Sequence, residues 1–311
     1  MISNLKRFLK STALTIAKRR GGFSSTGLSK SIFNQMRIRF GPPQKVAEYP
    51  NGAEAACVIS IDFDHLTKSQ QSTRDKWLPI RSDDLLARNR AGTQNLIRVS
   101  EKYEIPMTWA ICGKTAEEDP SSYEGILRSN QPQEIGLHTY SHADVSACSA
   151  SELELEVQRC LEVLKLSSPP KTFIFPWNRE GHFDKLKQMG FQAYRDKTRA
   201  VAYPDMARGL WNIPPTYYID QKSYGAHKLI KKYLDACMSW SSVFHLWLHP
   251  WSIVLDGGDS CKFTDATLDP LFSYLKERKE SGKLTICTMG ELASFCGESS
   301  ENQALRGRPK C

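Results

Sequence analysis

The chain has 311 residues, 40% of them hydrophobic and 24% charged, which suits one large domain with a substantial apolar core. The formal net charge is +8, but residues 1–47 hold ten Lys and Arg and no acidic residue, so the rest of the chain carries −2. The basic character therefore says nothing about the substrate of the main domain, and nucleic-acid binding would rest on this segment alone. We expect no nucleic-acid partner.

The N-terminal segment also lacks the apolar stretch of a secretory signal or a membrane span, because its longest apolar run, Ala13–Ala17, is short and contains Thr15. A solvated tail is the simplest interpretation. Peripheral contact with an anionic membrane surface is the second, and an organelle transit peptide the third. Nine irregularly spaced cysteines without a C-x-x-C pair indicate reduced thiols, hence a cytoplasmic protein, and peripheral membrane contact would place it at the inner membrane face.

Turn-forming residues around 41–52 end this segment, so we expect an extension at 1–50, a main folded domain at 51–297 and a tail at 298–311. Within the domain, short apolar runs alternate with helical patterns, which indicates parallel βα units in a barrel of about seven strands. The expected strands are 56–61, 106–113, 134–137, 172–175, 191–194, 243–249 and 283–287, and the expected helices are 92–103, 151–166 (capped by Ser151), 183–189, 229–239, 269–282 and 289–295. Active sites of such barrels lie at the C-terminal ends of the strands.

The first cluster of polar residues ends the first strand, where Asp62 and Asp64 flank Phe63. A turn or helix cap would explain either carboxylate equally well. In an extended chain, however, the two point to the same side, so they would converge on one spot.

The second cluster is His138 and His142, directly after the strand-like residues 134–137. Two histidines at i and i+4 lie on one face of a helical turn, a spacing that lets both imidazoles bind one ion. Solvated histidines are the alternative. With a carboxylate, such a pair leaves coordination positions open for water and substrate.

The third cluster lies in the strand at 243–249, where His245, Trp247 and His249 share a face. His249 is at the end of the strand, as expected for a catalytic group. His245 is four residues deeper, and a buried core histidine is its simpler interpretation.

In this order, Asp62-x-Asp64, His138-x-x-x-His142 and Leu248-His249-Pro250 resemble the motifs of the polysaccharide deacetylase family (carbohydrate esterase family 4). Further similarity lies at 105–109, 173–178 and 288–293, so the resemblance covers roughly residues 55–296. It implies a distorted (β/α) barrel and a hydrolase that removes N-acetyl groups from amino sugars.

The resemblance also implies roles for single residues. Asp64, His138 and His142 would hold a divalent metal ion, commonly zinc. Asp62 would be the general base, His249 the general acid, and the backbone N–H of Trp177 an oxyanion donor. The family's arginine that orients the base has no counterpart here, because its position is Ile174, and Arg179 is the replacement that we expect.

The expected substrate is an N-acetylated glycan or glycan precursor, since Trp177, Trp211, Trp247 and Trp251 near strand ends could stack on sugar rings. A metal-dependent amidase acting on a small nitrogen compound is a second hypothesis. A catalytically inactive glycan-binding domain is the third, and it leaves the five polar site residues unexplained. The sequence does not indicate an oligomeric state.

Overall fold

The computed structural model describes residues 47–64, 82–198, 204–255 and 260–306, which belong to a compact unit at Pro43–Cys311. The membrane contact expected for residues 1–47 falls almost entirely outside the described residues. Among the helices of the described residues, none has the length and apolar character needed to cross a membrane. The eight cysteines in these residues form no disulfide with one another.

Strand β1 (Ala55–Phe63) is the centre of the sheet, and all nine of its residues are buried. It pairs in parallel with β2 (Met107–Ile111), β9 (Val243–Leu248) and β10 (Leu284–Ile286). This full enclosure is the reason why the strand reads as an almost continuous apolar run rather than as an alternating pattern.

From β1, the sheet continues on one side through β2 and on the other through β9. The order is β6-β7-β5-β4-β3-β2-β1-β9-β8, and every described pairing is parallel except that of β6 with β7. The remaining strands are β3 (Gln133–Leu137), β4 (Thr172–Ile174), β5 (Ala193–Arg195), β6 (Asp205–Ala207), β7 (Leu210–Asn212) and β8 (Tyr217–Ile219). The two ends of the sheet do not pair within the described residues, so the sheet is a curved half-barrel. The predicted distorted (β/α) barrel is confirmed.

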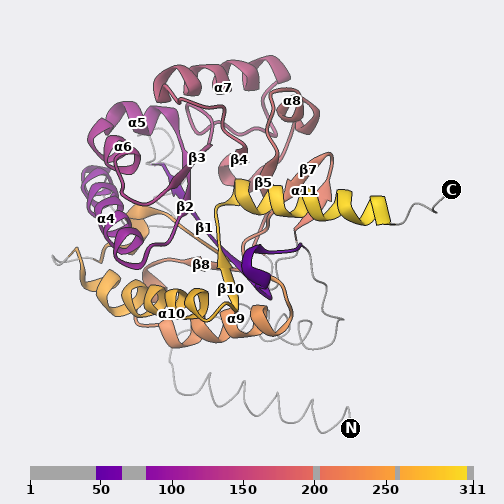
Figure 1. The fold of residues 1–311 in the computed structure, drawn as a ribbon. Coiled ribbons are helices and arrows are strands. Elements are labelled where there is room, and N and C mark those ends of the chain that lie inside the picture. The colour runs from indigo at the N-terminus through magenta and orange to yellow at the C-terminus, as the bar shows by residue number, and fades with distance from the viewer. Residues whose placement is uncertain (1–46, 65–81, 199–203, 256–259, 307–311) are drawn as a thin grey trace, which may run out of the picture. The chain divides into compact units, whose positions relative to one another are not determined.

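Helices surround the sheet (Figure 1). They are α4 (Ser82–Tyr103), α5 (Gly113–Glu118), α6 (Pro120–Leu127), α7 (Ala150–Leu164), α8 (Phe183–Gln188), α9 (His227–Ser239), α10 (Asp269–Glu280) and α11 (Met289–Arg306). Helix α11 runs past residue 297, where the sequence had predicted the end of the domain.

Alternate residues of β1 belong to different surroundings. Cys57, Ile59, Ile61 and Phe63 join the large core that includes the apolar faces of the helices. Residues of the opposite parity line the interior of the barrel, and their character changes along the strand. Ala56 and Val58 pack with α11 and other apolar residues, whereas Ser60, Asp62 and Asp64 follow toward the C-terminal end. The interior is therefore apolar at one end and polar at the other.

Two differences from the expected elements have clear physical reasons. Helix α4 begins ten residues before Gly92. The sequence offers no strong stop signal between residues 82–91 and the predicted helix, so the helix includes them. Helix α7 is capped by Ser149, not Ser151: the Ser149 hydroxyl accepts from the Glu152 N–H while Glu152 accepts from the Ser149 N–H. This reciprocal pair is a capping box, and it fixes the start of the helix.

We expect Ser149→Ala to lower the free energy of unfolding by about 1 kcal/mol, because one N-terminal N–H group of α7 loses its acceptor. Ser151→Ala is the matched control and should change stability by less than about 0.5 kcal/mol, since Ser151 is exposed on the first turn. Urea unfolding of both variants measures the difference. Equal losses in the two variants would contradict the cap assignment.

Candidate active site

The sequence-predicted polar residues meet at the C-terminal ends of the strands, where they line a cavity of about 210 Å³. Asp62 and Asp64 come from the end of β1, His138 and His142 from the loop after β3, and His249 from the residue after β9. All five side chains are buried. The cavity is also lined by Phe175, Trp177, Asn178, Arg195 and Trp247.

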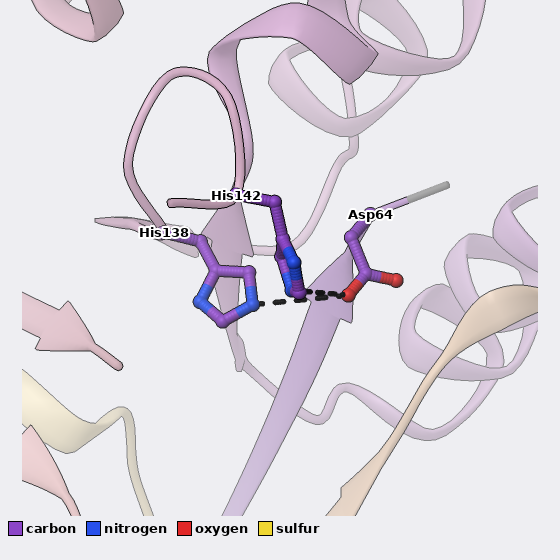
Figure 2. Close-up of side chains that lie close together, drawn as sticks. All are labelled: Asp64, His138 and His142. Carbon is purple, nitrogen blue, oxygen red and sulfur yellow. Dashed lines mark ion pairs between the residues drawn. The ribbon is translucent and has the colours of Figure 1, made fainter. Parts of the chain in front are cut away.

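Asp64, His138 and His142 form a group whose ligand atoms all lie within 4.8 Å of one another (Figure 2). The Oδ2 atom of Asp64 is 3.1 Å from Nε2 of His142 and 3.8 Å from Nε2 of His138. The other ring nitrogen of His138, Nδ1, donates to the carbonyl of Ile174 at 2.7 Å, which leaves Nε2 to face Asp64.

This donor set suits a divalent metal ion. Ligand atoms about 2.1 Å from a tetrahedral zinc lie about 3.4 Å from one another, and the two Asp64–His distances bracket that value. Burial lowers the pKa of His142, which favours the neutral imidazole that a metal requires. Burial alone would raise the pKa of Asp64, but His249, His138 and His142 together lower it well below its ordinary value. The carboxylate is therefore ionised at neutral pH.

The second oxygen of Asp64 has its own partner. The indole Nε1 of Trp251 donates to Oδ1 at 3.2 Å, and Trp251 is buried in the short helix Pro250–Ile253. The bond to Oδ1 leaves Oδ2 directed at the two histidines. Trp251 thus orients a carboxylate, and its burial leaves no face for the sugar stacking that the sequence suggested.

The spacing of the two histidines predicts a helical turn, but the structure places them in a loop. Residues 138–143 form a loop in which Thr139 and His142 have positive φ angles of 58° and 60°. Such angles are unfavourable for side chains with a Cβ, so the surroundings must hold the loop. The carbonyls of Thr139 and Tyr140 accept from the N–H groups of Gly113 and Lys114 at the start of α5.

Asp62 has a different set of neighbours from Asp64. Both nitrogens of the Arg195 fork donate to it, Nη1 to Oδ1 at 2.7 Å and Nη2 to Oδ2 at 2.5 Å. Burial by itself would raise the pKa of Asp62, but Arg195, His138 and His249 lower it below the ordinary value. The carboxylate is held in its charged form and in a fixed orientation.

Arg195 is the functional residue that sequence reasoning missed. It ends β5 directly beside Ile174 of β4, its register partner, so the arginine is displaced by one strand from the position of the family motif. The sequence did contain a signal for Arg195. It is a charged residue at the end of a predicted buried strand, which is the feature that singled out Asp62. The expected strand ended at Tyr194, one residue too early.

Arg195 is in turn fixed by a buried polar chain. Its Nη1 also donates to Ser60 Oγ at 3.0 Å, and Ser60 Oγ is 2.8 Å from His245 Nε2. The other nitrogen of His245 donates to the Ile213 carbonyl at 3.0 Å, so Nε2 is left to accept from the serine hydroxyl. Burial lowers the pKa of His245 to about 3, hence the ring is neutral at neutral pH. This agrees with the interpretation of His245 as a core residue.

The expected contact between Arg179 and Asp62 is not found. Arg179 instead pairs with Asp144, and its side chain is 60% exposed. The pair joins the loop of the two histidines to the loop after β4. The same two loops meet at Gly181, where a Cβ would lie 2.8 Å from the Val145 carbonyl oxygen.

Trp177 lies in the short helix Pro176–Asn178 with a positive φ of 60°, and 42% of it is exposed. Its ring stands against that of His142, with centroids 4.8 Å apart. The turn is closed by bonds from the Asn178 N–H to Phe175 and from the Arg179 N–H to Pro176. Neither bond uses the N–H of Trp177, the proposed oxyanion donor.

His249 faces both carboxylates. Its Nε2 is 3.8 Å from Asp62 Oδ2 and 3.7 Å from Asp64 Oδ2. The following residue, Pro250, is pressed against α4, since a Cβ on Gly92 would lie 2.0 Å from the Pro250 carbonyl oxygen. Glycine at position 92 is what allows the helix to approach this loop so closely.

Larger hollows exist elsewhere but lack this chemistry. One of about 450 Å³ is lined by Glu134, Lys171 and Gly290. The Glu134 carboxylate there already accepts hydrogen bonds from the hydroxyls of Thr108 and Thr172 and from the Gly290 N–H. We therefore assign the candidate active site to the smaller cavity.

Comparison with known proteins agrees with this geometry. Residues 70–193 match the family model described as Polysaccharide deacetylase. A peptidoglycan deacetylase of Helicobacter pylori (strain ATCC 700392 / 26695) is 27% identical over 88 residues. That alignment covers 28% of this chain and only 29% of the Helicobacter protein.

Solved structures show the same fold. A protein of Mycobacterium smegmatis described as a polysaccharide deacetylase superposes with a TM-score of 0.64 and 15% identity, over 87% of this chain and 96% of that one. A protein of Pseudomonas aeruginosa PAO1 with the same description gives 0.61 and 14% identity, over 82% and 94%. Puue allantoinase gives 0.59 and 14%, again over 82% and 94%.

Together, these matches define a deacetylase-type (β/α) half-barrel. Over residues 70–193, the chain is similar in sequence to the polysaccharide deacetylase family. Members of that family are hydrolases that act on carbon–nitrogen bonds other than peptide bonds.

We expect Arg195→Ala to lower the free energy of unfolding by about 3–5 kcal/mol at pH 7, because it leaves the buried Asp62 carboxylate without its cation. The loss should shrink as the pH falls. Without Arg195, the pKa of Asp62 rises, so the folded variant takes up a proton at a pH where the folded wild-type protein does not.

Urea unfolding at pH 7 and pH 4.5 measures both effects. Arg179→Ala is the control and should change stability by less than about 0.5 kcal/mol at either pH, since Arg179 is largely exposed. A loss for Arg195→Ala that is independent of pH would contradict the assignment.

Proposed function

We propose that the protein is a metal-dependent hydrolase that removes N-acetyl groups from amino sugars of a polysaccharide or a glycan precursor. One observation carries this proposal: two buried carboxylates with different partners converge with three histidines in a single cavity. Asp64 faces His138 and His142, while Asp62 is held by Arg195 and lies 3.8 Å from His249. Metal-assisted amide hydrolysis uses such a separation into metal ligands, base and acid.

Asp64, His138 and His142 would hold the metal ion. When bound, a divalent ion of this kind lowers the pKa of water toward about 7 and polarises a carbonyl oxygen. Zinc is the ion that a carboxylate and two imidazoles favour, although these ligands also accept other divalent metals.

The remaining residues handle protons and charge. Asp62, kept ionised by Arg195, would accept a proton from the attacking water. His249 would donate a proton from Nε2 to the leaving amine. The Trp177 N–H would donate to the oxyanion, a contribution that is typically worth about 100-fold or more in rate.

The N-acetyl sugar is favoured as substrate by the exposed ring of Trp177 beside the cavity. Of the four tryptophans that the sequence suggested, Trp251 is buried, and Trp211 packs against the apolar end of the barrel. Trp247 is half-buried against Tyr218 and Arg195. Trp177 therefore offers the one aromatic face among these four that a sugar could cover.

A small-molecule amidase is the second candidate. The fold of Puue allantoinase is similar, but at 14% identity that similarity extends to the fold alone. The inactive binding domain is disfavoured, because it would have no use for two charged carboxylates buried in the same cavity.

The cellular location is a separate proposal. Residues 1–47 contain ten basic and no acidic side chains, which would suit peripheral contact of a cytoplasmic protein with the inner membrane face. Deletion of residues 1–45 should then release the expressed protein from the membrane fraction. Unchanged membrane association would remove the proposal.

The central test combines elemental analysis with acetate release from N-acetylglucosamine oligomers. We expect one metal ion per wild-type chain, and Asp64→Asn to lose both metal and acetate release. Asp62→Asn should retain the metal but release acetate roughly 10²–10⁴-fold more slowly, because only the base is lost. His227→Gln, which alters a histidine outside the site, is the control and should match the wild type.

The outcomes separate the hypotheses. If the wild type binds metal but releases no acetate, the proposed metal site stands and small amides become the substrates to test. A wild-type protein that takes up no metal would refute the mechanism and favour the binding domain.

A further inference from the structure

The outer side of His249, away from the carboxylates, contacts a tyrosine of the neighbouring strand. The hydroxyl of Tyr218 lies 3.3 Å from Nδ1 of His249, and the two rings are nearly perpendicular at 87°. Tyr218 is the middle residue of β8 and the register partner of Trp247 in β9. Its place is thus fixed by the backbone ladder of two parallel strands.

Trp247 connects this tyrosine to the other half of the site. Its ring centroid is 4.2 Å from that of Tyr218, with 32° between the planes, and 5.4 Å from that of His249. The guanidinium carbon of Arg195 lies 4.4 Å from the Trp247 ring, a cation–π distance. Arg195 in turn holds Asp62 through two hydrogen bonds. An unbroken series of contacts therefore runs from His249 through Tyr218, Trp247 and Arg195 to Asp62.

We propose that Tyr218 is the positioning residue of the acid His249, and that the Tyr218–Trp247–Arg195 stack sets the separation of His249 from Asp62. The proposal rests on the function proposed above. Nothing in the linear sequence marks Tyr218, which lies 31 residues from His249 and outside every motif.

The chemistry of the contact explains the choice of tyrosine. A hydroxyl can accept a hydrogen bond from the protonated ring and donate one to a neutral Nδ1, so the contact survives both states of an acid catalyst. Because Nδ1 is engaged by Tyr218, Nε2 is the nitrogen that faces the cavity. The aromatic stack then limits rotation of the tyrosine ring itself, and with it the position of the hydroxyl.

The first experiment removes only the hydroxyl. Tyr218→Phe keeps the ring stack, and we expect kcat for acetate release to fall roughly 10–100-fold, by analogy with losing the hydrogen-bond partner of a metal-binding histidine. KM should stay within about twofold and the metal content should not change. Tyr217→Phe is the matched control: the adjacent tyrosine packs on Tyr233 instead and should retain wild-type kcat.

A double mutant separates positioning from a general structural effect. In a His249→Gln background, Tyr218→Phe should cause no further loss of kcat, because the group that it positions is gone. Trp247→Phe should retain more activity than Trp247→Leu, since phenylalanine still offers a ring to Tyr218. Wild-type kcat in Tyr218→Phe, or an equal loss in the His249→Gln background, would overturn the proposal.

The nitrogen NMR signals of His249 give a readout that does not depend on the reaction. Tyr218→Phe should shift the Nδ1 signal of His249, whereas Tyr217→Phe should not. A shift in a protein that releases no acetate would refute the proposed function and retain the positioning contact. An unchanged Nδ1 signal would refute the positioning contact whatever the activity.

Discussion

Two carboxylates, Asp62 and Asp64, are buried two residues apart at the end of β1, and most of the site can be understood as compensation of their charge. An unpaired carboxylate in such surroundings would take up a proton or destabilise the fold. The guanidinium of Arg195 compensates Asp62, while the histidines and the Trp251 indole surround Asp64. The partners come from three segments, so this single constraint ties β5, the β3 loop and the loop after β9 to the central strand.

The same compensation separates the two carboxylates chemically. Asp62 is bound through both oxygens by one cation, which suits a base of fixed orientation. Asp64 has one oxygen engaged by an indole and the other directed at two imidazole nitrogens, which suits a metal ligand. Two identical side chains thus acquire different capacities from their surroundings alone.

The loops that carry His142 and Trp177 are held in unfavourable backbone conformations, with positive φ at both residues. Strain of this kind persists only where neighbouring contacts outweigh it. Here the main contacts are the close approach at Gly181 and the bond from His182 to the Cys148 carbonyl, and the exposed Arg179–Asp144 pair adds little to stability. The sequence predicted that Arg179 orients the general base, Asp62. Arg179 instead connects the two loops through Asp144, so its position in the motif region predicted the wrong partner.

The sequence by itself determined the alternating strands and helices, and it located Asp62, Asp64, His138, His142 and His249 at strand ends. It could do so because strand periodicity is local, and because the C-terminal ends of parallel strands meet at one edge. Cap positions were harder to predict, since Ser149 and Ser151 are equally good caps by residue type. Short elements such as β8 were also harder to predict. Only the tertiary structure decided the partners. Arg195 replaces an arginine absent at Ile174 because register places the two residues side by side. Tyr218 and Trp251 reach His249 and Asp64 through contacts between segments whose proximity no local pattern encodes.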